Sequence, residues 1–246
     1  MLSGQRPTVP AAASEPEAAA AELQLERFLA AGSRQRLRDL PALERLGRSL
    51  HGPIWKILAV KDRQPHDWAL GCLLRLLAQD DEQIKILRDR HPQGWLEAPQ
   101  GGNYGELEWS LIESRFEQAD RLTSAELRRL AGAAAEKRGY VYFSEVAQIG
   151  SAELRHLDSL WWFYGAGRFG FRVQRRLLDG LNGRWEQLWP RLGWKDAGSW
   201  TRYPGSFTWS LQAPEGHLPL VNQLRGVRLM DALLSHPAIA ESRSGP

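Results

Sequence analysis

Three polar side chains near the C-terminus form the clearest candidate binding motif of this sequence. Arg225 and Arg228 lie three residues apart, on neighbouring positions of one helical face, and Asn222 lies one turn earlier. Two guanidinium groups and an amide could hold carboxylates through charge-assisted hydrogen bonds. A solvated basic helix face is the alternative interpretation of the same pattern.

Aromatic residues are concentrated just before this motif. The chain contains 11 tryptophans, and Tyr203, Phe207 and Trp209 follow Trp200 in a run broken by a proline and a glycine. Such a run cannot form one buried helix. It could line a pocket for a large flat ligand, with the arginines as an anionic anchor, although aromatic surplus can also be core.

A formal dinucleotide-binding fingerprint, G-x-G-x-x-G, occupies residues 165–170. This fingerprint requires a strand before it and a parallel strand after the following helix. The helical spacing of Leu154, Leu157 and Trp161 argues against the first strand. We therefore expect a tight turn between two helices, with Phe169 and Phe171 packed inward. An NAD-dependent enzyme is the least favoured interpretation.

No other motif indicates catalysis or metal binding. The six histidines lack metal-ligand spacing, and the single cysteine, Cys72, excludes a disulfide framework. His217 could be an axial metal ligand, but we expect a loop histidine bonded to the backbone. Asp120 and Asp158 are expected to act as helix caps or ion-pair partners. The sequence predicts a protein that is not an enzyme.

Composition narrows the remaining classes of protein. The formal charge of +3 is too small to indicate nucleic-acid binding. No window has the roughly 18 consecutive apolar residues of a transmembrane helix. We expect a soluble protein of a reducing compartment.

Apolar residues at helical spacing predict an all-α protein with two domains. We expect a disordered leader over residues 1–21, a small helical bundle over 22–92 and a glycine- and proline-rich linker over 93–105. The second domain is expected to span 106–238, before a flexible tail over 239–246.

Several elements of the second domain can be placed from their patterns. A first helix is expected to run to about Phe116, and Thr123 is expected to cap a second one. Later helices are expected over 173–181 and 224–234. The stretch 198–219 is expected to be loop-rich, with short extended pieces at most.

Five separated motifs, in this order, resemble the genomes-uncoupled-four family of tetrapyrrole-binding proteins. They are LDSLW at 157–161, GRFGFRVQ at 167–174, GW at 193–194, APEGHLP at 213–219 and LRGVR at 224–228. The resemblance covers about residues 104–237, and the N-terminal bundle resembles the extra domain of cyanobacterial members. It implies a mostly helical, cupped domain that binds protoporphyrin IX and magnesium protoporphyrin IX.

The resemblance also implies which residues contact the porphyrin. Ring contacts would come from Phe143, Tyr203 and Phe207, and propionate contacts from Asn222 and Arg225. Phe116 and Leu122 would belong to the wall of the cup, and Arg228 joins the set through its pairing with Arg225.

The family stimulates magnesium chelatase in chlorophyll biosynthesis by acting with the large porphyrin-binding subunit of that enzyme. By this resemblance we expect a monomeric, cytoplasmic regulator that could associate peripherally with photosynthetic membranes. The alternative is an adaptor whose aromatic loops bind another protein, because exposed Trp, Tyr and Arg side chains also form interface hot spots.

Overall fold

The computed structural model describes residues 15–100, 102–220 and 227–241. The chain divides into two compact units, 1–61 and 62–246. Both are helical, and the described residues contain only two short strands. The expected all-α fold class is confirmed.

The first unit consists of four short helices. They are α1 (Glu15–Ala30), α2 (Ser33–Glu44), the 3-10 helix η1 (Gly47–Leu50) and α3 (His51–Leu58). Its core includes Ala21, Leu25 and Phe28, spaced three and four residues apart so that one face of α1 is buried. The side chain of Arg36 ties α2 to α1 by donating a hydrogen bond to the carbonyl of Phe28 (3.0 Å).

The expected disordered leader is wrong over its last seven residues, because α1 begins at Glu15. Pro16 occupies the first turn of the helix, where a missing N–H costs nothing, and the alanines that follow favour helix. Ala21 is fully buried. Residues 1–14 lie outside the described part of the chain.

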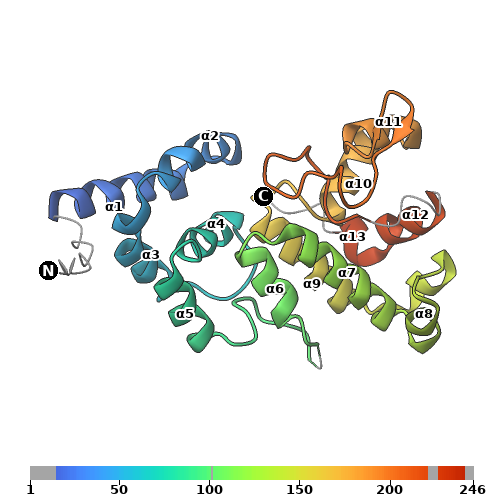
Figure 1. Cartoon of the computed structure of the whole chain (residues 1–246), viewed down its shortest axis with the longest axis horizontal. Helices are drawn as coiled ribbons and strands as arrows, with labels where there is room; N and C mark the ends of the chain where they lie inside the picture. The colour runs from blue at the N-terminus through green and yellow to red at the C-terminus, as the bar shows by residue number, and fades with distance from the viewer. Residues whose placement is uncertain (1–14, 101, 221–226, 242–246) are drawn as a thin grey trace, which may run out of the picture. The chain divides into compact units, whose positions relative to one another are not determined.

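The second unit contains the remaining elements (Figure 1). They are α4 (Trp68–Leu77), α5 (Asp81–Arg90), α6 (Gly105–Ile112), α7 (Phe116–Leu130), α8 (Ala133–Arg138), the 3-10 helix η2 (Phe143–Gln148), α9 (Ser151–Tyr164), α10 (Phe171–Gly180), α11 (Trp185–Arg191), β1 (Lys195–Asp196), β2 (Ser199–Trp200), α12 (Val227–Ser235) and α13 (Pro237–Ala240). The strands β1 and β2 form a small antiparallel hairpin.

The division between units lies earlier than the expected linker, because α4 and α5 pack with the second unit. Helix α4 approaches α9 so closely that a Cβ at Gly71 would lie 2.2 Å from the carbonyl oxygen of Phe163. The segment expected as a linker also packs inward, since Trp95 and Leu96 are buried. Their N–H groups donate to Glu108 on α6, at 2.9 and 2.8 Å.

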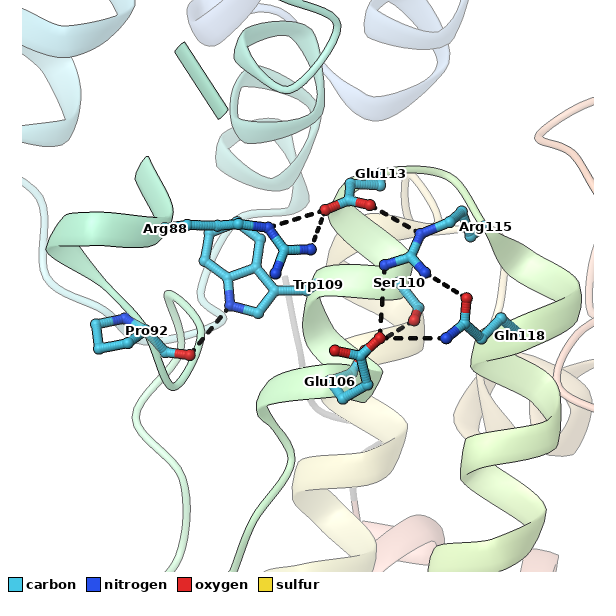
Figure 2. A network of polar contacts seen from close by, with 8 residues as sticks. All are labelled: Arg88, Pro92, Glu106, Trp109, Ser110, Glu113, Arg115 and Gln118. Carbon is cyan, nitrogen blue, oxygen red and sulfur yellow. Dashed lines mark hydrogen bonds and ion pairs between the residues drawn. The ribbon is translucent and has the colours of Figure 1, made fainter. Parts of the chain in front are cut away.

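A polar network on α5, α6 and α7 adds to this attachment (Figure 2). Arg88 pairs with Glu113 and lies over the ring of Trp109, 4.6 Å from its centroid. The other oxygen of Glu113 pairs with Arg115 at 2.8 Å. The indole of Trp109 donates to the carbonyl of Pro92 (3.3 Å). The end of α5 is thus held against the end of α6 and the beginning of α7.

Helix α7 does not begin at Thr123, as expected, but at Phe116. Thr123 lies inside the helix, where its hydroxyl donates to the carbonyl of Ala119 (2.8 Å) and accepts from the indole of Trp161 (2.9 Å). A hydroxyl bonded to the preceding turn cannot cap a helix. Trp161, on α9, is fully buried and stacks on Phe116, so α7 and α9 share a core.

The glycine motif at 165–170 forms the turn between α9 and α10, as predicted. Phe169 and Phe171 are fully buried. Gly170 has a φ of +107°, and a Cβ there would lie 2.8 Å from Oδ1 of Asp158. Asp158 accepts the N–H of Arg172 (2.8 Å) and pairs with its guanidinium, so it is both a cap of α10 and an ion-pair partner.

The remaining expected elements are close to those observed. Helix α10 matches the expected 173–181, and α12 covers the described part of 224–234. The loop-rich stretch after residue 198 contains only the short β2 strand, as expected. The expected tail begins inside α13, where Ile239 is fully buried, and residues 242–246 lie outside the described part. Within the described ranges, the helices are all too short or too polar to cross a membrane.

Candidate functional site

The second unit contains a cavity of about 630 Å³. Its walls come from α7, from the segment between α8 and α9, from the region of β2 and from α12. The lining residues are Asp120, Ser124, Leu127, Arg128, Gly139, Tyr140, Val141, Ile149, Trp200, Thr201, Arg202, Tyr203, Leu220, Leu229 and Leu233. Most of this surface is aliphatic or aromatic, with two arginines and one carboxylic acid.

Helix α7 contributes one continuous row of cavity-lining side chains. Asp120, Ser124 and Arg128 are spaced four residues apart and Leu127 lies beside them, so all four share one face of the helix. The neighbouring side of α7, three residues on from Asp120, is held in the core through the bond between Thr123 and Trp161. The packing of α7 against α9 therefore fixes the orientation of this row.

Asp120 is the acidic residue of the lining, and its side chain joins two distant parts of the chain. It is 2% exposed, and its Oδ1 accepts the N–H of Leu220 at 2.6 Å. Burial raises the pKa of Asp120 to about 7, partly opposed by the hydrogen bonds from Leu220 and Tyr203; Glu117 raises it further and Arg121 lowers it. Asp120 is therefore neither a helix cap nor an ion-pair partner, contrary to the expectation.

Asp120→Asn is expected to change how stability depends on pH. The pKa of Asp120 is 3.8 for an unperturbed group and about 7 in the folded protein, so folding takes up a proton between these values. The free energy of unfolding therefore falls as the pH rises through this window. Asparagine keeps an oxygen for the N–H of Leu220 but does not titrate.

Urea denaturation tests this expectation. The free energy of unfolding of Asp120→Asn minus that of the unsubstituted protein should rise with pH, by up to about 1 kcal/mol per pH unit between about pH 5 and about pH 7. Other titrating groups contribute to both proteins equally and cancel in the difference. Parallel curves would show that Asp120 does not titrate in this range.

An aromatic cluster supports the cavity lining in the segment that follows β2. Tyr203 lines the cavity and is 43% exposed, and its ring lies 5.9 Å from that of Phe207. Phe207 is buried between Trp209, at 5.6 Å, and His217, at 5.0 Å. Of the predicted ring contacts, Tyr203 therefore lies on the cavity, and Phe207 lies behind it as support.

His217 is fully engaged by the backbone, as predicted for a loop histidine. Its Nε2 accepts the N–H of Thr208 (3.2 Å), so Nδ1 carries the proton and donates to the carbonyl of Leu192 (2.6 Å). Burial lowers the pKa of His217 and favours this neutral form. Neither ring nitrogen is available to a metal ion.

The other predicted contacts do not line the cavity. Phe116 is 1% exposed and packs among core aromatics at the start of α7, so it supports the fold instead of forming a wall. Leu122 is half-buried on α7 but not on the face that carries Ser124. Phe143 is 48% exposed at the start of η2.

The predicted arginine pair is only partly described. Arg228 is exposed at the start of α12 and lies over the ring of Phe143, 5.6 Å from its centroid. The structure brings these two predicted residues together, but next to the cavity lining and not within it. Asn222 and Arg225 lie outside the described residues.

Several lining residues were not singled out by the sequence. Tyr140 and Val141 follow a left-handed Gly139 that ends α8, and Ile149 follows η2. Arg128 and Arg202 are separated by 74 residues (202 − 128), and no spacing rule connects them. Only the row at 120, 124, 127 and 128 carried a signal, because its members share one face of an amphipathic helix.

Comparison with known proteins identifies the family. A family model described as GUN4-like matches residues 97–237. A "Ycf53-like protein" of Synechocystis sp. is 43% identical over 166 residues, which cover 67% of this chain and 71% of the relative. A "Tetrapyrrole-binding protein, chloroplastic" of Arabidopsis thaliana is 38% identical over 54% of each chain.

A solved structure shares the fold. The structure of GUN4 from Chlamydomonas reinhardtii matches with a TM-score of 0.55 and 34% identity, covering 59% of this chain and 93% of that one. Residues 97–237, which the family model matches, include the glycine turn, the β2 region and the motifs from which the resemblance was inferred. The chain belongs to the GUN4-like, or genomes-uncoupled-four, family.

Proposed function

We propose that this protein binds protoporphyrin IX and magnesium protoporphyrin IX in the cavity described above. The proposal includes a regulatory role: the bound protein stimulates magnesium chelatase through the large porphyrin-binding subunit of that enzyme, without catalysing a reaction itself. The observation that carries it is the cavity, whose lining combines leucines, aromatic rings and guanidinium groups. The protein would act as a monomer, in the cytoplasm or at the photosynthetic membrane.

The cavity fits the physical character of a porphyrin. Its volume of about 630 Å³ lies in the range of small-molecule sites. A porphyrin is a flat apolar disc, so burial against Leu127, Leu229 and Leu233 would supply most of the affinity at about 25 cal/mol per Å². Trp200 and Tyr203, both partly exposed, are placed to lie along the ring.

The family supports the ligand class. The Arabidopsis relative is named as a tetrapyrrole-binding protein, and it is 38% identical to this chain over 143 residues. The chelatase role and the choice between metal-free and magnesium forms rest on the family resemblance. The cavity itself favours only the planar, acidic, apolar ligand class.

An adaptor that binds a protein is the second candidate function. Tyr142 and Phe143 are about half exposed, and they directly follow the lining residues Tyr140 and Val141. Exposed aromatic side chains next to arginines can also anchor a protein partner. A porphyrin titration distinguishes the two candidates, because an adaptor would not change the spectrum of the porphyrin.

Ser124→Trp is expected to abolish porphyrin binding while the fold is kept. Ser124 is a small, half-buried residue that lines the cavity from α7, so an indole at this position would occupy the space of the ligand. The adjacent Ala125 is exposed outside the lining, which makes Ala125→Trp the matched control. We expect a loss of affinity of at least about tenfold for Ser124→Trp, about 1.4 kcal/mol, and none for Ala125→Trp.

The measurement is the shift of the Soret band when deuteroporphyrin IX or its magnesium form is titrated with each protein. Circular dichroism establishes that both variants are folded. Unchanged binding by Ser124→Trp would place the ligand elsewhere. The same three proteins added to reconstituted chelatase at limiting magnesium test the regulatory role, since only the two that bind porphyrin should stimulate.

A further inference from the structure

Two arginines of the cavity lining come from different elements of the fold. Arg128 belongs to α7 and is half-buried, and Arg202 follows β2 and is exposed. Small polar side chains, such as those of Ser124 and Thr201, also belong to the lining. The rest of the lining is largely apolar and contains one acidic side chain, Asp120, so these two guanidinium groups are the positive charges of the lining.

The position of Arg128 on α7 directs it to the cavity. Ser124 and Arg128 are separated by one helical turn on the face that lines the cavity, and Leu127 extends the same face with apolar surface. An arginine here buries its stem along aliphatic neighbours and presents the guanidinium at the edge of the wall. A ligand that lay against Leu127 would therefore meet a cation at its edge.

Neither guanidinium is neutralised within the part of the chain that the structure describes. Arg121, two turns before Arg128 on α7, pairs with Glu117, and Arg129 pairs with Glu126 at 2.7 Å. Arg128 lies between Glu126 and Arg129 in sequence and forms no ion pair or side-chain hydrogen bond with any described residue. Arg202 forms none either, within the same limits. The donors of both side chains remain open for an anionic partner.

Arg228 differs from these two residues. It lies over the ring of Phe143, and it does not belong to the cavity lining. Its contact with the ring gives it an alternative partner outside the cavity. Of the two arginines that the sequence favoured, Arg228 is thus less well placed than Arg128 and Arg202, and Arg225 lies outside the described residues.

We propose that Arg128 and Arg202 bind carboxylates of the ligand, so that the acidic edge of the macrocycle faces the wall formed by α7 and the segment after β2. This assignment rests on the proposed function, and it specifies the orientation of the ligand in the cavity. A guanidinium can hold a carboxylate through two parallel hydrogen bonds, and the cost of desolvation is lower at the exposed Arg202 than at a buried site. The apolar rings then face the leucines of α7 and α12.

The test combines arginine variants with a ligand that lacks the negative charges. Deuteroporphyrin IX and its dimethyl ester, in the same dilute detergent, are titrated with the full-length protein and followed by the Soret band. Arg128→Gln and Arg202→Gln should each weaken binding of the diacid about tenfold. Binding of the ester should change less than about twofold. Arg128→Lys should restore part of the loss, because it keeps the charge but not the planar fork.

Two arginines serve as matched controls. Arg129→Gln changes the next residue on α7, whose partner is Glu126, and Arg228→Gln changes the arginine beside Phe143. Both should preserve the preference for the diacid over the ester. Thermal melting of every variant establishes that each one is folded.

Each outcome of the titrations decides the assignment. A selective loss of diacid binding in the Arg128 and Arg202 variants supports it. Equal losses for both ligands, an unchanged preference, or a selective loss only in Arg228→Gln would each overturn it while leaving the proposed function intact. If the unsubstituted protein binds neither ligand, the proposed function fails, and the assignment fails with it.

Discussion

Glu108→Ala is expected to reduce the free energy of unfolding by about 3–5 kcal/mol, because it leaves three buried donors without an acceptor. The carboxylate of Glu108 accepts the N–H groups of Trp95 and Leu96 and the hydroxyl of Tyr164. All four residues are buried in the second unit. Desolvation by burial raises the pKa of Glu108 to about 7, against the hydrogen bonds, which lower it.

Two further variants of α6 serve as controls for Glu108→Ala. Glu108→Gln keeps an amide oxygen for the N–H groups of Trp95 and Leu96, so it should be destabilised much less. Glu106→Ala removes a more exposed carboxylate from the same helix, where the ion pair with Arg115 is long at 3.7 Å, and should cost less than about 1 kcal/mol. Urea denaturation gives the three values. If Glu108→Ala were no less stable than Glu108→Gln, the bonds to the 95–96 segment would contribute nothing.

Trp161→Ala is expected to reduce the free energy of unfolding by about 3–5 kcal/mol, the usual range for removing a fully buried aromatic side chain. The indole fills the space between α7 and α9, stacks on Phe116 and donates to Thr123. Its removal leaves a void and a hydroxyl without its donor. Because Thr123 lies beside the cavity-lining residues Asp120 and Leu127 on α7, we also expect weaker porphyrin binding if the proposed function holds.

The next residue is the control for this substitution. Trp162 is half-exposed and lies near the guanidinium of Arg172, 5.2 Å from the ring centroid. Trp162→Ala should therefore destabilise the protein less, by about 1–2 kcal/mol. Chemical denaturation and thermal melting compare the two variants. Equal losses would mean that the buried position of Trp161 adds nothing to the stability of the fold.

The sequence predicted those elements that depend only on neighbouring residues. The glycine turn before Phe171 was predicted correctly because the helical spacing upstream excluded a strand. Thr123 was misread because the same residue types cap helices and bond back to the preceding turn inside them. Only the partners of the hydroxyl, Ala119 and Trp161, distinguish the two cases, and one of them is distant in sequence.

The division of the chain could not be predicted from periodicity. A pattern of apolar residues shows that a helix buries a face but not which element covers that face. The sequence of α4 is apolar at every position except Arg75, and the prediction did not use this. In the structure every residue of α4 except Arg75 is buried. A helix that is apolar almost all round belongs to the interior of a larger unit, which is where α4 lies, against Phe163 of α9.

The candidate site was predicted in part. Tyr203 lies on the cavity and Phe207 directly behind it, whereas Phe116 belongs to the core. Arg128 and Arg202 could not be assigned to one cavity from the sequence, because that depends on how the β2 region and α7 are placed in the tertiary structure.

The hydrogen bond between Asp120 and Leu220 spans one hundred residues of sequence. The hollow thus has walls from segments that lie far apart in the second unit, and a chain emerging from the ribosome has α7 long before it has Leu229 and Leu233. A chain that stops short of α12 lacks these two apolar side chains of the lining. If the proposed function holds, we expect such a nascent chain to bind porphyrin less well than one that includes α12.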